Sequence, residues 1–155
     1  MSIFNPESFL DASTTEALTK RPPLPAGSTF IATVGEPKSR TWQGKQDPTK
    51  SGIAVDLPLE IDMTAYPEMR ELIGGATKVT LKGSIMLDLN EQGAIDWGAG
   101  KNSALRRYRE ALGLNQAGVP FSIRQMQGRQ LMVKIKHREY EGELFDDIDT
   151  VARIS

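Results

Sequence analysis

Apolar and polar residues alternate along five stretches of this chain, as they do in strands that bury one face and expose the other. The stretches cover residues 28–36, 53–63, 77–89, 129–140 and, less sharply, 144–154. One further segment has helical spacing, with Leu105, Tyr108 and Leu112 on a single stripe. Ser103 is the candidate N-cap of this helix, and Gly113 is its candidate C-cap. The pattern predicts a mainly β chain with one helix between the third and fourth strands.

This order of elements is that of the OB-fold, a five-stranded, partly open Greek-key barrel. In that fold the second and third strands, with the loops joining strands one to two and four to five, form the ligand face. We therefore expect residues 28–155 to form a five-stranded OB-fold-like barrel. Residues 1–27 contain four prolines and are interpreted as an N-terminal arm. Phe4, Phe9 and Leu10 are candidates to pin this arm to the barrel.

The polar segment 37–52, PKSRTWQGKQDPTKSG, occupies the first of these loop positions. It has one acidic residue, Asp47, in a chain whose formal net charge is -1. Its cations and its tryptophan are Lys38, Arg40, Trp42, Lys45 and Lys50. Cations and an indole on one loop can follow a phosphate backbone while a base stacks on the ring. The segment predicts a local site for single-stranded nucleic acid, and the alternative is a solvated loop whose Trp42 folds back onto the sheet.

The predicted strands add further cations to this surface. Lys78 and Lys82 lie on the polar face of the third strand, where Gly83 interrupts the apolar face and indicates a bend or bulge. The outward residues of the fourth strand are Lys134, Lys136, Arg138 and Tyr140. Such rows are also typical of simple solvated faces, and the polar side of the second strand is acidic. Trp97, between Asp96 and Gly98, is assigned a structural role.

Three segments carry a resemblance to a known group of proteins. They are FLDASTTEALTKRPPLPAGSTFIATVGEPKSR, SALRRYREALGLNQAG and GRQLMVKIKHREYEGELFDDIDTVARI. In these segments the chain resembles small bacteriophage proteins, some of which are described as single-stranded DNA-binding proteins with an OB-fold. The resemblance implies sequence-independent single-stranded DNA binding in phage DNA replication or recombination, with phage replication proteins as further partners in the infected host cell. Such proteins often end in a disordered acidic tail, whereas here the acidic run of residues 139–149 precedes VARIS and predicts a charged hairpin.

The chain offers little for catalysis. It has no cysteine, and its one histidine, His137, falls on the predicted core face of a strand, which excludes zinc sites and Cys–His pairs. Neither a phosphate-binding glycine loop nor a nucleophile elbow is present. We therefore expect no enzyme activity, no catalytic residue, no metal and no cofactor. The remaining catalytic alternative is a nuclease holding magnesium on carboxylates such as Asp88 and Asp96.

Length and composition limit the setting. A chain of 155 residues fits one domain, and a pI near 5.9 argues against a protein that coats duplex DNA by bulk charge. Without cysteine, and without about eighteen successive apolar residues, the chain is expected to be cytoplasmic and to have no membrane partner. The rival function is a non-catalytic structural or adaptor protein, either a virion component or a binder of a host factor. The oligomeric state stays open, with a homodimer among the alternatives.

Overall fold

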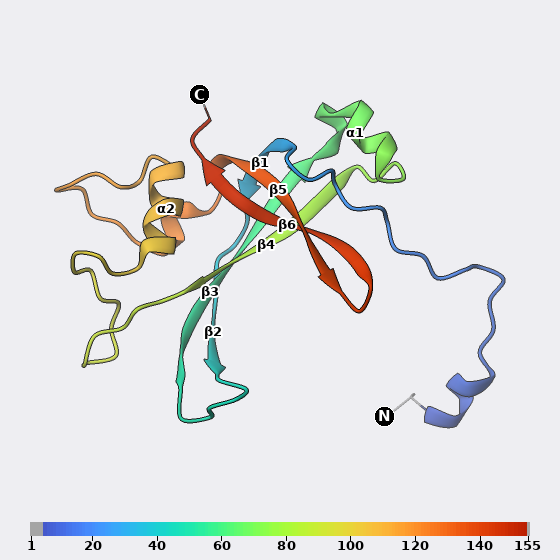
Figure 1. The fold of residues 1–155 in the computed structure, drawn as a ribbon, viewed down its shortest axis with the longest axis horizontal. Coiled ribbons are helices and arrows are strands. Elements are labelled where there is room, and N and C mark those ends of the chain that lie inside the picture. Colours follow the sequence, from blue (N-terminus) through green and yellow to red (C-terminus); the bar gives the residue numbers. More distant parts are fainter. Residues whose placement is uncertain (1–4, 155) are drawn as a thin grey trace.

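A six-stranded antiparallel sheet forms the body of the protein in a computed structural model that describes residues 5–154 (Figure 1). The strands are β1 (Thr29–Val34), β2 (Lys38–Gln43), β3 (Ser51–Asp62), β4 (Lys78–Met86), β5 (Gln130–Tyr140) and β6 (Glu143–Ala152). The helices are α1 (Pro67–Leu72) and α2 (Ser103–Ala111), with 3₁₀ turns η1 (Pro6–Asp11), η2 (Met63–Ala65) and η3 (Ile123–Met126). The prediction of a mainly β chain is confirmed, and α2 lies between β4 and β5 as predicted.

β3 is the strand around which the sheet is organised. Its first half pairs with β2, and its end pairs with β1 along the same edge. β4 pairs with the other edge of β3, from Ala54 to Asp62. β5 pairs with β1, and β6 pairs with β5. β1 and β2 therefore lie end to end along β3, with residues 35–37 between them.

The sheet is open rather than closed. In the described part of the chain no hydrogen-bonded ladder joins β4 to β6, so each of these strands has an unpaired outer edge. The closed five-stranded barrel is therefore not confirmed. The strand that the sequence did not predict is β2. It lies inside the segment 37–52, which we expected to be a loop.

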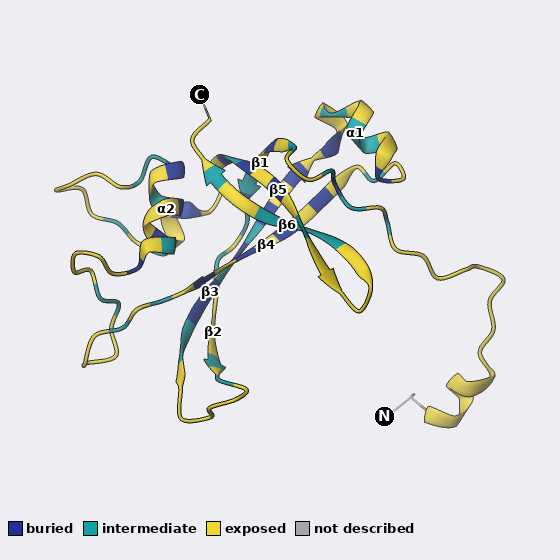
Figure 2. Ribbon diagram, in the orientation of Figure 1, coloured by how far each residue is buried: buried dark blue, intermediate teal, exposed yellow. Residues whose placement is uncertain are grey.

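The predicted alternation builds the core. On β4, Val79, Leu81, Gly83 and Ile85 are buried, whereas the residues at the alternate positions are exposed (Figure 2). The other strands bury Phe30, Ala32, Val34, Val55, Leu57, Leu59, Ile61, Leu131, Val133 and Ile135. Leu105 and Tyr108 of α2, and Leu112 at the C-cap of this helix, pack in this core as predicted. Each fully buried aliphatic side chain contributes about 1.5 to 3 kcal/mol, so the sheet is held mainly by this face.

Gly83 makes room for a side chain of α2 and does not introduce a bulge in β4. The pairing of β3 with β4 keeps one register along all of β4, so the expected bulge is wrong. A Cβ at Gly83 would overlap the hydroxyl of Tyr108 and lie 3.1 Å from its Cζ atom. The glycine therefore leaves the space into which the helix inserts its tyrosine. The one register shift in this region lies between Lys134 and Ile135, where β5 pairs with β6.

The N-terminal arm is held at its C-terminal end. Arg21 Nη1 and Nη2 donate to the two carboxylate oxygens of Asp146 at 2.7 and 3.1 Å, and the buried Leu24 donates its N–H to Asp146 Oδ2 at 2.9 Å. Burial by itself raises the pKa of Asp146, but the hydrogen bonds from Arg21 and Leu24 outweigh it and lower the pKa. His137, which is only partly buried, places Nε2 2.8 Å from the Leu24 carbonyl oxygen. These contacts tie the arm to β5 and β6.

The rest of the arm extends away from the sheet. After η1 it has no regular structure, and its residues are exposed (Figures 1 and 2). Phe4 lies outside the described residues, Phe9 is exposed, and Leu10 is 85% exposed. Leu10 therefore does not pin the arm to the body.

Candidate nucleic-acid interface

Five of the predicted residues share one side of the sheet. In antiparallel pairs, residues opposite each other point to the same face. Lys38 lies opposite Asp56, and Arg40 and Trp42 follow at every second position along β2. Lys78 and Lys82 lie opposite Asp62 and Pro58 on the same, non-core side of β3. We call this surface the β2–β4 face, defined by Lys38, Arg40, Trp42, Lys78 and Lys82.

Acidic residues of β3 neutralise part of this face. Arg40 Nε lies 2.8 Å from Asp56 Oδ2, and the hydroxyl of Ser84 donates to Asp56 Oδ1 at 2.8 Å. These two hydrogen bonds, Arg40 first, hold the pKa of Asp56 below its usual value. Lys78 Nζ lies 3.7 Å from Glu60 Oε1. Part of the positive charge expected for a phosphate backbone is therefore already paired within the protein.

Trp42 is stacked on its own sheet. The residue opposite it on β3 is Gly52, and a Cβ there would lie 2.8 to 2.9 Å from Nε1, Cε2 and Cζ2 of the indole. Nε1 is buried, and no hydrogen-bond partner for it exists among the described residues. The side chain as a whole is only partly buried. The structure thus supports the fold-back interpretation, while part of the indole remains exposed.

The loop predicted at 37–52 is largely a hairpin. β2 and β3 pair from Lys38 to Gln43, which leaves a turn of residues 44–50 at the tip. Lys45 and Lys50 are exposed in this turn. Asp47 Oδ1 accepts the N–H of Thr49 at 3.1 Å and so fixes the turn locally. The prediction failed here because it read a polar segment as irregular, although polar strands form where a partner strand supplies the pairing.

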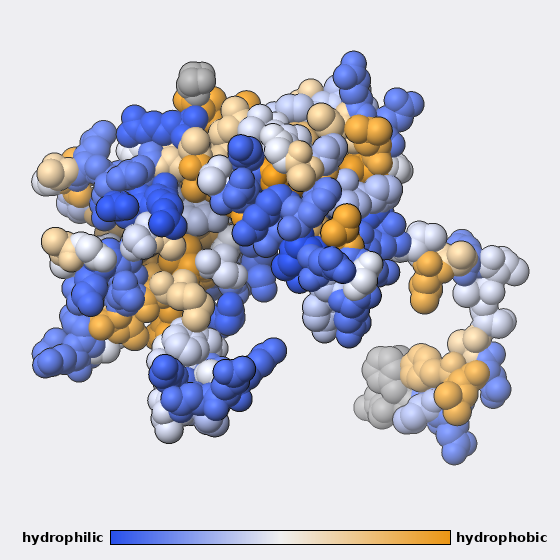
Figure 3. Space-filling model, in the orientation of Figure 1, coloured by the Kyte–Doolittle hydropathy of each residue, from blue (hydrophilic) through white to orange (hydrophobic). Residues whose placement is uncertain are grey.

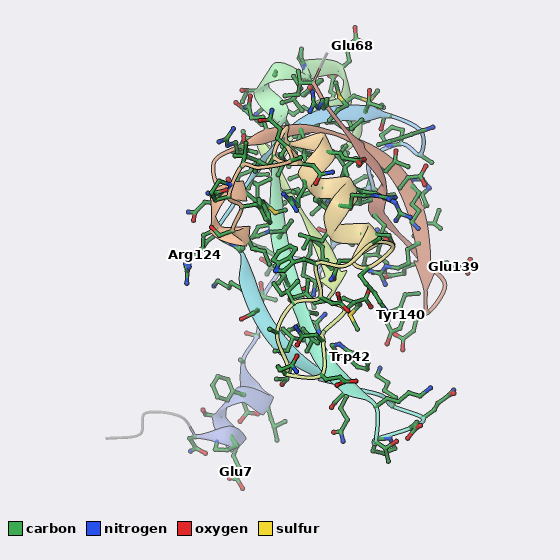
Figure 4. The ribbon with its side chains drawn as sticks, turned by 90° about the vertical axis from the view of Figure 1, so that its left-hand side faces the viewer. Glu7, Trp42, Glu68, Arg124, Glu139 and Tyr140 are labelled. Carbon is green, nitrogen blue, oxygen red and sulfur yellow. The ribbon has the colours of Figure 1, made fainter. Side chains whose placement is uncertain are left out.

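The fourth predicted strand, β5, exposes its predicted binding residues but does not place all of them near the β2–β4 face. Lys134, Lys136, Arg138 and Tyr140 are all exposed, as predicted. β1 separates β5 from β3 in the sheet, so Lys134 and Lys136 do not join the β2–β4 face. Tyr140 lies at the end of the β5–β6 hairpin, on the same side of the body as the β2–β3 hairpin that carries Trp42 (Figures 1 and 4).

A cleft of about 810 Å³ separates the unpaired edges of β4 and β6, and α2 forms its third side. Its cations are Lys82, Arg138 and Arg107, and its carboxylates are Asp146, Asp147 and Asp149. The cleft thus brings Arg107 of α2, which was not among the candidate site residues, beside Lys82 and Arg138, which were. The sequence signal that could have identified Arg107 was its position directly before Tyr108, which lies on the apolar stripe of the predicted helix. Positive and negative side chains balance in this cleft.

Tyr108 forms part of the same cleft. Burial, followed by the nearby charge of Asp147, raises the pKa of Tyr108 to about 12. The phenol therefore stays protonated at neutral pH, and its hydroxyl lies over Gly83.

Residues 5–154 contain no group of three or more histidine, cysteine, aspartate or glutamate side chains arranged to hold a metal ion. Within the same range, no helix has the length and apolar character needed to cross a membrane. Comparison with models of known protein families and with curated proteins finds no match for this chain.

Proposed function

We propose that this protein binds single-stranded DNA with little sequence preference and without catalysis, on an OB-fold-like sheet. The observation that carries the proposal is the β2–β4 face, where two strands place four cations on the same side of the sheet as an indole. Cations that follow a backbone and an aromatic ring that stacks a base are the two elements of sequence-independent single-strand binding.

The connectivity supports the OB-fold-like assignment. When β1 and β2 are counted as one interrupted strand and the short helix α1 between β3 and β4 is set aside, the order is strand, strand, strand, helix, strand, strand. β3 and β4 then take the places of the two strands that bind ligands in that fold. The turns at 44–50 and 141–142 take the places of its two binding loops, and both hairpins project from the same side of the body (Figure 1).

The charge on the face indicates how binding would divide between ionic and stacking contributions. The structure records no ion pair for Lys38 or Lys82 among the described residues, whereas Arg40 and Lys78 are paired. An ionic contribution from few free cations gives a shallow salt dependence, because each neutralised phosphate adds only about 0.7 to the slope for single strands. Stacking, worth about 1 to 3 kcal/mol for each base, then supplies a large share of the affinity.

The test is fluorescence anisotropy with a labelled oligothymidine of about 30 nucleotides and a matched duplex, at low and moderate salt. We expect binding to the single strand that weakens with salt and is much poorer on the duplex. Trp42→Ala should lose affinity at every salt concentration, whereas Lys45→Ala should mainly flatten the salt slope. Arg124→Ala, which removes an exposed cation on η3 away from the face, is the matched control (Figure 4). Absence of single-strand binding at low salt would refute the proposal.

The resemblance to phage proteins supports a place for this activity in phage DNA replication or recombination. Single strands are exposed in both processes, and a protein without sequence preference can cover them wherever they arise. The partners expected from this resemblance are phage replication proteins, and the setting is the infected host cell.

The structure also favours a second function, as an adaptor. Leu10 and Leu18 are 85% and 102% exposed on the arm, and apolar patches stand clear of the body there (Figure 3). Exposed apolar side chains on an extended segment are typical of a contact with another protein. The test is recovery of a defined partner after nuclease treatment. Loss of that partner with Leu18→Ser, but not with Trp42→Ala, would favour the adaptor role.

A further inference from the structure

The second tryptophan of the chain, Trp97, lies at a hollow of about 300 Å³ between the loop that follows β4 and helix α2. Its side chain is 57% exposed. The structural role that we assigned to Trp97 from the sequence therefore does not involve burial in the core. Phe121 meets the ring edge-on, with the centroids 6.3 Å apart, and the guanidinium of Arg109 lies 5.9 Å from the ring centroid. Two neighbours therefore position an indole that keeps most of its surface open.

The loop that carries Trp97 is itself fixed. Asn102, a buried polar residue, donates from Nδ2 to the carbonyl oxygens of Asp88 and Asp96 at 3.0 and 2.9 Å. Asp88 Oδ2 in turn accepts the N–H of Asn102 at 2.7 Å. Trp97 follows Asp96 directly, so its backbone is anchored one residue away. A ring that is placed before a ligand arrives loses little conformational entropy on binding.

The hollow is the most positive of the cavities described in this structure. Lys101, Arg106 and Arg109 line it together with one carboxylate, Asp96. Asp96 Oδ1 accepts the N–H of Gly98 at 2.9 Å, so this carboxylate is engaged within the loop. The larger cleft between β4 and β6, by contrast, has as many carboxylates as cations. The hollow therefore combines an exposed ring with a surplus of positive charge.

Arg109 is held and adds rigidity to the site. Its Nε and Nη2 atoms donate to the carbonyl oxygen of Leu114 at 3.2 and 3.1 Å, and its guanidinium lies 4.1 Å from the centroid of the Phe121 ring. Lys101 and Arg106 are exposed, and the contact between Arg106 and Glu110 is long, at 3.8 Å between Nε and Oε1. Lys101 has no ion pair among residues 5–154, and Arg106 can exchange its solvent-exposed pair with Glu110 for an anion.

We propose that this hollow is a second stacking site for single-stranded DNA, in which Trp97 stacks a nucleobase while Lys101 and Arg106 contact the adjoining phosphates. The inference rests on the proposed function. It is supported by the position of the loop, which begins at Leu87. The N–H of Leu87 donates to the carbonyl oxygen of Ile53 at 3.0 Å, next to Gly52 beneath Trp42. The loop therefore begins beside the Trp42 end of the β2–β4 face.

The chain contains two tryptophans, which allows each site to be followed separately. Trp42→Phe leaves Trp97 as the only indole, and Trp97→Phe leaves Trp42. Each variant is titrated with oligothymidine of about 30 nucleotides at low salt, with indole emission and the anisotropy of a labelled strand recorded together. A base stacked on the ring quenches its emission, so we expect quenching in both variants, at strand concentrations that match the anisotropy curve.

Affinity supplies the second measurement. Trp97→Ala should weaken binding by about 5- to 150-fold, the range for loss of one stacked base, and Lys101→Ala should reduce the salt slope. Arg124→Ala, an exposed cation outside the hollow, should do neither. Trp97→Phe keeps an aromatic contact to Phe121 and Arg109, so it separates loss of stacking from loss of loop structure.

The outcomes distinguish this inference from the function on which it rests. If the labelled strand binds but the emission of Trp97 does not change and Trp97→Ala binds as tightly as the parent, the hollow is not part of the DNA path and only this inference fails. If the parent binds no single strand at low salt, the proposed function fails and the stacking site fails with it.

Discussion

Asp56 lies in the middle of the β2–β4 face, and its removal gives a sharp test of that face. Its carboxylate holds Arg40 at 2.8 Å and accepts the hydroxyl of Ser84 at 2.8 Å. A DNA phosphate that approached Arg40 would have to compete with this carboxylate. Asp56→Asn removes the negative charge, keeps the side-chain shape and retains an oxygen for Ser84. Arg40 then becomes available to a phosphate.

The two consequences have opposite signs. One further neutralised phosphate steepens the salt slope by about 0.7, which amounts to roughly a fivefold gain in affinity at 0.1 M salt relative to 1 M. The side chains of Arg40 and Asp56 are 44% and 18% exposed, and a solvent-screened ion pair of this kind contributes at most about 1 kcal/mol to the free energy of unfolding. We therefore expect a variant that is slightly less stable and binds single-stranded DNA more tightly.

The assay is anisotropy at four or more salt concentrations, with thermal unfolding recorded on the same samples. Glu68→Gln makes the same change of charge on α1, away from the face, and should leave the salt slope unaltered (Figure 4). An Asp56→Asn protein that is folded yet shows the affinity and slope of the parent would refute the assignment of the β2–β4 face to phosphate contacts.

Three further predictions concern contacts of the sheet, at Gly83, Gly52 and Asp146. Gly83→Ala should lower the free energy of unfolding by about 1 to 3 kcal/mol, because its methyl group overlaps the Tyr108 hydroxyl, and Tyr108→Phe should recover part of this in denaturant titrations. Equal losses in the two backgrounds would contradict that packing. Gly52→Ala should displace the indole of Trp42, shift its emission to longer wavelength as Nε1 becomes hydrated, and weaken strand binding; an unchanged spectrum would show that the ring does not rest there. Asp146→Asn should remove a contribution to the free energy of unfolding. This contribution is fully present above the ordinary carboxyl pKa of 3.8 and is lost as the pH falls through the lowered pKa of the folded state. The difference in unfolding free energy from the parent should thus be constant near neutral pH and shrink below about pH 4, and a constant difference down to pH 2 would be inconsistent with the lowered pKa.

Five of the six strands could be located from the sequence: four bury alternate apolar side chains, and β6 (Glu143–Ala152) was expected at 144–154 on a less sharp pattern. β1, β3, β4 and β5 follow this rule closely. β2 could not be located in this way, since Lys38–Gln43 contains no fully buried residue. Its strand conformation comes from pairing with the first half of β3, and a local pattern does not record such a pairing.

For the candidate site, too, the sequence predicted which residues of one strand share a face, but not which strands are neighbours. Alternation correctly puts Lys78 and Lys82 on one face, because both belong to a single strand. Whether Lys134 joins them depends on which strands are neighbours, and β1 lies between β5 and β3. The pairing of Arg40 with Asp56 likewise depends on the register of β2 against β3. Long-range order and register thus decide which cations meet and which are neutralised.

The acids on the β2–β4 face indicate which force dominates under the proposed function. Asp56 and Glu60 hold cations of neighbouring strands, and cross-strand pairs of opposite charge stabilise a sheet by a few tenths of a kcal/mol each. The stability of the sheet and its attraction for phosphate therefore compete for the same side chains. Affinity then depends more on the two indoles, Trp42 and Trp97, than on charge. A protein with a net charge of -1 can select single strands in this way, because a duplex keeps the faces of its bases stacked and out of reach of both rings.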